Sequence, residues 1–155
     1  MSEGNGPDLP PEADQPQAEA TRLAFVREFA ATSPHYQAMG MSLVEMDEGR
    51  AVLRVAIQPS QLNADGIVHG GVLPAIADGA MGNALRTLYG AAAQVLTAEI
   101  HLHYLRPVTG GSLLAEGRVV QSGRRLSFAE VEMRDEANGK PVARGSGVFV
   151  IEPGT

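Results

Sequence analysis

The sequence predicts a single α+β domain, with a curved antiparallel sheet of about six strands wrapped around one long central helix. Three observations indicate this class. A helical pattern near residues 70–89 is apolar on most of its circumference. A hairpin pattern precedes this helix, and four strand-like segments separated by turn residues follow it. One buried helix combined with several antiparallel strands makes an α+β domain in which the sheet curls around the helix.

The first residues differ in composition from the rest of the chain. Residues 1–16 contain proline, glycine and acidic side chains with almost nothing to bury, which is typical of a disordered acidic leader. We therefore expect the single folded domain over 17–155. The start of the chain has neither the basic nor the apolar segment of a signal peptide, and this predicts a cytoplasmic protein.

The composition excludes several classes of function. The chain has no cysteine, which excludes disulfides, thiolate nucleophiles and zinc sites with cysteine ligands. Its net charge of −6 argues against a nucleic-acid-binding surface. No apolar run approaches the length of a membrane span. Because the chain as a whole is acidic, a polyanionic ligand would need a local cluster of arginines.

The first elements are a helix and a hairpin. Apolar residues recur at steps of three and four over 18–31, which predicts an amphipathic helix that ends before Pro34. A short turn through Tyr36 and Met39 should follow. The segment 40–57 alternates apolar and polar residues around an Asp-Glu-Gly tip, which predicts a β-hairpin.

The second half of the chain should supply the long helix and the rest of the sheet. A loop over 58–69 leads to the helix, whose broad apolar surface indicates that it is covered on several sides. Three of the later segments are joined by short turns, so the sheet is antiparallel at least there. The four remaining strands are expected over 94–108, 111–123, 125–136 and 140–152.

Asp78 lies on the most apolar helix of the chain, although burying an unpaired carboxylate costs several kcal/mol. Small residues stand one turn away from it on the same side, so this face leaves room for a ligand. Two interpretations stay open. Asp78 either lies solvated or paired at the edge of the helix, or it does chemistry beside a bound molecule.

Residues before this helix could polarise a carbonyl oxygen. His69, Gly70 and Gly71 occupy the start of the helix, where backbone amides lack intrahelical partners and the helix dipole is positive. Glycine lets a ligand reach these amides, as in an oxyanion hole, although a Gly-Gly pair also serves a simple tight turn. Asn63 could donate its side-chain amide to the same oxygen, or it could be an ordinary Asx-turn residue.

Three segments carry a resemblance to a known family. LNADGIVHGGVLPAIADGAMG, TAEIHLHYLRPV and SGRRLSFAEVEMRDEANGKPVARGSG together resemble the PaaI-like hotdog-fold acyl-CoA thioesterases, over about residues 35–152. The resemblance implies the hotdog fold and hydrolysis of a coenzyme A thioester without a metal or organic cofactor. It implies that Asn63 and the Gly70 amide bind the thioester oxygen. It also implies that Asp78 acts on the thioester carbon, as nucleophile or as base for water.

The resemblance further implies a hydroxyl residue on the strand after the helix, which would be Thr97. Period-2 alternation places Thr97 on one polar face with Glu99, His101 and His103, so it reaches the site only near a strand end or a bulge. The last three residues could form a metal cluster. Without an obvious further ligand, a solvated face or a subunit contact is the favoured interpretation.

Substrate contacts are expected at the start of the helix and at a hairpin tip. At the helix start, next to the Gly70 amide, His69 is expected to be a catalytic residue and Gly71 a substrate-binding residue. Arg124 and Arg125 lie at a hairpin tip, where the family places basic residues against coenzyme A phosphates; a solvated turn is the alternative.

Methionines suggest how the acyl group is held. Met39, Met41 and Met81 predict an adaptable apolar pocket that does not distinguish aryl from short or medium acyl chains.

If the strand near 93–107 ended the sheet of a monomer, it would leave a row of unpaired backbone groups, and such an edge invites pairing with a second copy. The resemblance implies a homodimer built on these edges, or a homotetramer of two such dimers. Each cleft would then combine Asn63 and Gly70 of one subunit with Asp78 of the other.

Two alternative functions stay open. One is a non-catalytic module that binds or senses acyl-CoA. The other is a hotdog hydratase or dehydratase, which ranks lower because the pattern Asn-Pro-x-His-x-Asp of those enzymes is absent.

Overall fold

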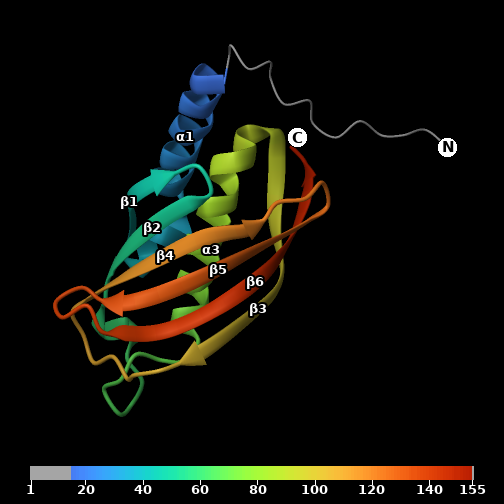
Figure 1. The fold of residues 1–155 in the computed structure, drawn as a ribbon. Coiled ribbons are helices and arrows are strands. Elements are labelled where there is room, and N and C mark those ends of the chain that lie inside the picture. Colours follow the sequence, from blue (N-terminus) through green and yellow to red (C-terminus); the bar gives the residue numbers. More distant parts are fainter. Residues whose placement is uncertain (1–14, 155) are drawn as a thin grey trace.

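The computed structural model describes residues 15–154, so the expected leader lies outside the described residues except for its last two positions. A six-stranded antiparallel sheet curves around the long helix α3 (Val72–Tyr89), as Figure 1 shows. This arrangement confirms the predicted α+β fold with its central helix. Within the described range, no helix has both the length and the apolarity that crossing a membrane requires.

Two helices precede the sheet. Helix α1 (Gln15–Thr32) begins two residues before the predicted domain boundary. The turn predicted after it is wrong, because the chain forms a second helix there, α2 (Pro34–Met39). Ser33 Oγ accepts a hydrogen bond from the Tyr36 amide at 3.3 Å, and a proline occupies the first helical position. The Ser-Pro pair therefore ends one helix and begins the next.

The sheet order is β1-β2-β4-β5-β6-β3, and every neighbouring pair is antiparallel. Strand β3 crosses over to pair with β6 and ends the sheet, so the condition for an unpaired edge is met within this chain. Residues 15–154 also contain the short helices η2 (Pro59–Gln61) and η3 (Gly90–Ala92). The strands are β1 (Met41–Asp47), β2 (Arg50–Ala56), β3 (Ala93–Tyr104), β4 (Ser112–Gln121), β5 (Leu126–Asp135) and β6 (Pro141–Pro153).

The core lies between α3 and the concave face of the sheet. Ten of the 18 residues of α3 are buried, which confirms that this helix is covered on several sides. Its backbone rests directly on β4 at Gly117. A Cβ atom there would lie 2.7 Å from Met81 N and closer still to the carbonyl of Ala80. Only glycine permits this approach, because no side chain fits between the helix backbone and the strand.

Replacing Gly117 with alanine should therefore destabilise the protein. Overpacking of this kind costs about 1–3 kcal/mol, and a shift of about 2–4 °C per kcal/mol gives a Tm lower by roughly 2–12 °C. Gly82→Ala is the matched control. A Cβ at Gly82 meets no atom within 4 Å, so alanine should raise the stability by about 0.5–1 kcal/mol through helix propensity. Thermal unfolding followed by circular dichroism measures both, and a Gly117→Ala protein as stable as wild type would contradict the close contact.

Candidate functional site

Asp78 is half-buried on α3 and is hydrogen-bonded to the sheet. Thr97 Oγ1, at the start of β3, donates to Asp78 Oδ1 at 2.5 Å. The hydroxyl compensates part of the cost of removing the carboxylate from water. Asp78 is thus paired through one oxygen, and Oδ2 has no hydrogen-bond partner among residues 15–154.

A β-bulge brings Thr97 to the helix side of the sheet. In the β3–β6 ladder Thr97 lies opposite Phe149 and Glu99 lies opposite Val148, so Ala98 is the extra residue. Phe149 is buried under α3, and Thr97 shares its face. The predicted alternation, which grouped Thr97 with Glu99 and the two histidines, is therefore wrong. The bulge shifts the alternation by one residue between them.

The loop before α3 leaves one amide available to a ligand. The Gly71 amide donates to His69 Nδ1 at 2.9 Å, and the Val72 amide donates to the His69 carbonyl at 2.9 Å. The Gly70 amide forms no hydrogen bond with any residue that the structure describes. Gly71, expected to bind substrate, thus uses its amide within the loop. A neutral His69 that accepts at Nδ1 carries its proton on Nε2.

Tyr104 holds the peptide that follows Gly70. Its hydroxyl donates to the Gly70 carbonyl at 2.6 Å, and the amide of the same peptide donates to His69 Nδ1. Two consecutive glycines would otherwise rotate easily about this peptide. The two hydrogen bonds therefore fix the direction of the backbone next to the available amide. The sequence pattern gave no signal for Tyr104, because the contact spans 34 residues.

Asn63 forms the Asx turn that was one of its two interpretations. Its Oδ1 accepts from the amides of Asp65 at 2.9 Å and Ile67 at 3.1 Å. These bonds orient the side-chain amide and leave the Nδ2 donor without a partner in the described part of the chain. The turn role is therefore compatible with donation to a ligand.

The candidate residues form two separate groups in one chain. Thr97 and Asp78 are in contact, and His69, Gly70 and Tyr104 are in contact. The first group lies further along α3, because Asp78 comes six residues after the first residue of the helix, about 9 Å along its axis.

A pocket of about 180 Å³ opens beside Asp78. It lies between α1, α2 and α3, next to the start of β3. Its walls include polar side chains from α2, α3 and β3. Tyr36 comes from α2, Asn83 and Arg86 come from α3, and Thr97 comes from β3. The pocket is therefore polar at many points of its surface.

The prediction that three methionines form the acyl pocket is wrong. Met41 and Met81 are buried in the core, and none of the three methionines lines the space beside Asp78. Met81 instead packs under Gly147, where an added Cβ would lie 3.0 Å from its Cε. Flexible apolar side chains fill irregular gaps in cores as readily as they line ligand pockets.

Tyr36 anchors α2 to the wall of this pocket. Asn83 Nδ2 donates to the Tyr36 hydroxyl at 2.9 Å, and that hydroxyl donates to the Gly79 carbonyl at 3.3 Å. Burial raises the pKa of Tyr36 to about 12, and the negative charge of Asp78 acts in the same direction. Burial also lowers the pKa of Arg86.

Residues 65–142 match the model of the Thioesterase superfamily. The chain belongs to this superfamily and is a thioester hydrolase. It is 33% identical over 123 residues to a Halobacterium salinarum protein named as an esterase, covering 73% of this chain and 81% of that protein. It is 26% identical over 106 residues to human acyl-coenzyme A thioesterase 13, covering 68% and 75%.

A solved structure supports the same assignment. A variant of the phenylacetic acid degradation protein PaaI from Thermus thermophilus superposes with a TM-score of 0.69 at 29% identity, covering 76% of this chain and 98% of that protein. The predicted resemblance to PaaI-like hotdog thioesterases is thereby confirmed.

The two arginines expected to bind coenzyme A lie at the predicted hairpin tip of the thioesterase. Arg124 and Arg125 are exposed in the turn between β4 and β5. Tyr89 Oη, at the last residue of α3, donates to the Gly123 carbonyl at 3.1 Å and ties this turn to the helix end. The arginines therefore lie at the opposite end of α3 from Gly70.

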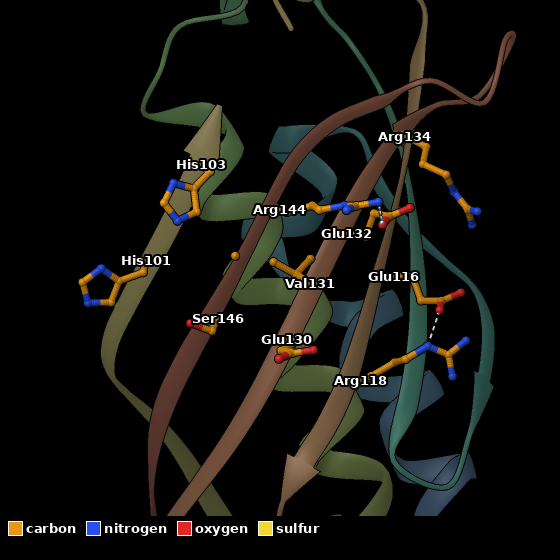
Figure 2. A pocket seen from close by; sticks show the side chains of 11 residues that line it. His101, His103, Glu116, Arg118, Glu130, Val131, Glu132, Arg134, Arg144 and Ser146 are labelled. Atoms are coloured by element: carbon orange, nitrogen blue, oxygen red, sulfur yellow. Dashed lines mark hydrogen bonds and ion pairs between the residues drawn. The ribbon is translucent and has the colours of Figure 1, made fainter. Parts of the chain in front are cut away.

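A larger hollow of about 600 Å³ lies on the other face of the sheet. Figure 2 shows the side chains around it, which include His101 and His103 on β3 and the hydrogen-bonded pair Arg118 and Glu116 on β4. Glu116 and Arg118 flank Gly117 and point away from α3. The described residues contain no group of three or more side chains that could hold a metal, and the hollow lies away from Asp78.

The raised pKa of Tyr36 predicts how stability changes with pH. Between pH 10 and 12 the unfolded chain loses the tyrosine proton while the folded chain keeps it. The stability that the protonated Tyr36 hydroxyl contributes is therefore fully present below pH 10 and is lost as the pH rises toward 12. Wild-type thioesterase should lose more unfolding free energy over this range than Tyr36→Phe does.

Urea unfolding at several pH values compares these slopes, independently of the stability that the variant loses at all pH values. Parallel curves for wild type and Tyr36→Phe would contradict this account of the buried hydroxyl.

Proposed function

We propose that the thioesterase hydrolyses an acyl-coenzyme A thioester to a free acid and coenzyme A, with Asp78 as the reacting carboxylate. The observation that carries this proposal is the position of Asp78. It is half-buried at the wall of a pocket, and Thr97 orients one of its oxygens. The similarity to human acyl-coenzyme A thioesterase 13 supports coenzyme A as the thiol part of the substrate.

Two routes are open to Asp78. As a general base it takes a proton from water, whose oxygen attacks the thioester carbon. As a nucleophile it attacks that carbon itself and forms a mixed anhydride, which water then hydrolyses. In both routes the C–S bond breaks, and the leaving thiolate of coenzyme A gains a proton. Thr97 binds Oδ1 and leaves Oδ2 to react.

The developing negative charge on the thioester oxygen needs hydrogen-bond donors. The Gly70 amide and Asn63 Nδ2 suit this role, because neither has a partner within residues 15–154. The Gly70 amide also lies at the N-terminal side of α3, where the helix dipole favours negative charge. His69 and Tyr104 act as positioning residues that hold the adjoining peptide.

The complete site is proposed to need two subunits. Within one chain, Asp78 lies about 9 Å along the helix axis from the loop that carries the donors. The exposed edge of β3 offers backbone groups for pairing with a second copy. Each cleft would combine Asn63 and Gly70 of one subunit with Asp78 of the other. Two such dimers would join through the charged outer face of the sheet, shown in Figure 2.

Arg124 and Arg125 are proposed to bind the phosphates of coenzyme A. Both are exposed, and the guanidinium group matches phosphate geometry through paired hydrogen bonds. In a chain with a net charge of −6, a local pair of arginines is the kind of site that a polyanion requires.

Asp78→Asn tests the proposed chemistry. The amide keeps the shape of the side chain but can neither attack carbon nor accept a proton, so kcat should fall by at least about 10²-fold. Thiol release from a panel of acyl-CoA esters, followed with a chromogenic thiol trap, measures the rate. Glu28→Gln, an exposed carboxylate on α1, is the control and should keep wild-type kcat. Activity of Asp78→Asn within about threefold of wild type would remove Asp78 from the mechanism.

Mixing two inactive variants tests the shared cleft. Asp78→Asn and Asn63→Ala subunits are unfolded together and refolded as a mixture. Random pairing makes half of the dimers mixed, and each mixed dimer has one intact cleft, so up to about a quarter of wild-type activity should return. A mixture that forms mixed dimers yet stays as inactive as its parents would show that each site lies within one subunit.

A further inference from the structure

We propose that the pocket beside Asp78 accepts a short acyl group that ends in a carboxylate, and that Arg86 binds this carboxylate. The thioester carbon would lie at Asp78 and the anionic end at Arg86. This inference rests on the proposed function of Asp78. It adds the substrate class and a residue that determines specificity.

Asp78, Gly82 and Arg86 lie along one side of α3. They follow one another at four-residue intervals, so their side chains share a helix face. All three line the same pocket. Arg86 comes eight residues after Asp78, which is about 12 Å along the helix axis. The pocket therefore has a negative group near one end and a positive group near the other.

Gly82 leaves the floor between these two charges open. A Cβ at Gly82 would meet no atom within 4 Å, and its φ is not in the left-handed region. Neither a close backbone contact nor a special conformation requires glycine here. Glycine in a helix interior costs about 0.5–1 kcal/mol relative to alanine. What the residue contributes is the empty space above it.

Arg86 carries a charge that forms no direct ion pair among residues 15–154, although the negative charge of Asp78 acts on it from across the pocket. Its side chain is half-buried. Its polar contact is a long hydrogen bond of 3.5 Å to the Val95 carbonyl, and its guanidinium carbon lies 4.2 Å from the centre of the Phe29 ring. A partly buried charge is unfavourable until a partner arrives. A carboxylate would supply that partner through paired, charge-assisted hydrogen bonds.

The size of the pocket limits the acyl group. Its volume of about 180 Å³ is close to that of a cavity of about 150 Å³ that holds benzene. An acyl group of about six heavy atoms therefore fits this space.

The first test needs only wild-type protein. We compare kcat/KM for the mono-coenzyme A esters of glutaric and adipic acid with kcat/KM for butyryl-CoA and hexanoyl-CoA. The better of the two diacid esters should be preferred by about tenfold or more over the neutral ester of similar length. An equal or reversed preference would overturn the inference, while hydrolysis of the neutral esters would still support the proposed function. A protein that hydrolyses none of the esters would instead contradict the proposed function.

Variants of Arg86 assign the preference to one side chain. Arg86→Met keeps the length and apolar part of the side chain but removes the charge, so the diacid preference should fall about tenfold. Arg86→Lys keeps the charge without the planar fork and should retain part of the preference. An unchanged ratio in Arg86→Met, or an equal loss on both esters, would exclude Arg86 as the specificity residue.

Gly82→Leu tests the location of the acyl group independently of charge. Leucine suits a helix interior better than glycine does, so the variant should fold, and thermal unfolding checks this. Its side chain would occupy the space between Asp78 and Arg86. Activity on the six-carbon esters should fall at least tenfold relative to acetyl-CoA. An unchanged ratio of six-carbon to two-carbon activity would place the acyl group elsewhere and overturn the inference.

Discussion

The contact between the backbone of α3 and strand β4 determines where the reactive side chains lie. Gly117 lets the helix touch the strand at Ala80 and Met81, only two residues after Asp78. The point of closest approach is therefore within one helical turn of Asp78. A helix held this tightly cannot rotate or slide without a backbone collision. Asp78 thus has a fixed height above the sheet, where Thr97 can reach it.

Most of the architecture follows from patterns that are local in sequence. The long helix, the hairpin and the four later strands are signalled by apolar periodicity and turn residues, and all of them are present. The sequence pattern does not predict α2, because Ser33 and Pro34 are interpreted only as the end of the first helix. Ser33 also caps the next helix through its hydroxyl, and a cap of this kind is visible only when the following turn is considered as helical.

The site itself was only partly predictable. Asp78 and Gly70 stand out because a carboxylate and a Gly-Gly pair are unusual around an apolar helix. Tyr104 and Arg86 do not stand out, since their importance depends on contacts across the fold. Tyr104 contacts Gly70 across 34 residues of sequence, and no local sequence pattern predicts a contact at that separation. Arg86 attracts interest only once the structure shows that it lies half-buried without an ion pair in the described chain.

The bulge in β3 has a consequence for how this strand tolerates change. Ala98 acts as a phase shift in the pleat, so Thr97 faces the helix while Glu99 and His101 face outward. The identity of residue 98 matters less than its presence. Removing one residue would restore a uniform pleat and turn either the hydroxyl or the following charged side chains to the wrong side. The segment can thus accept many substitutions at position 98, but its length cannot change by a single residue.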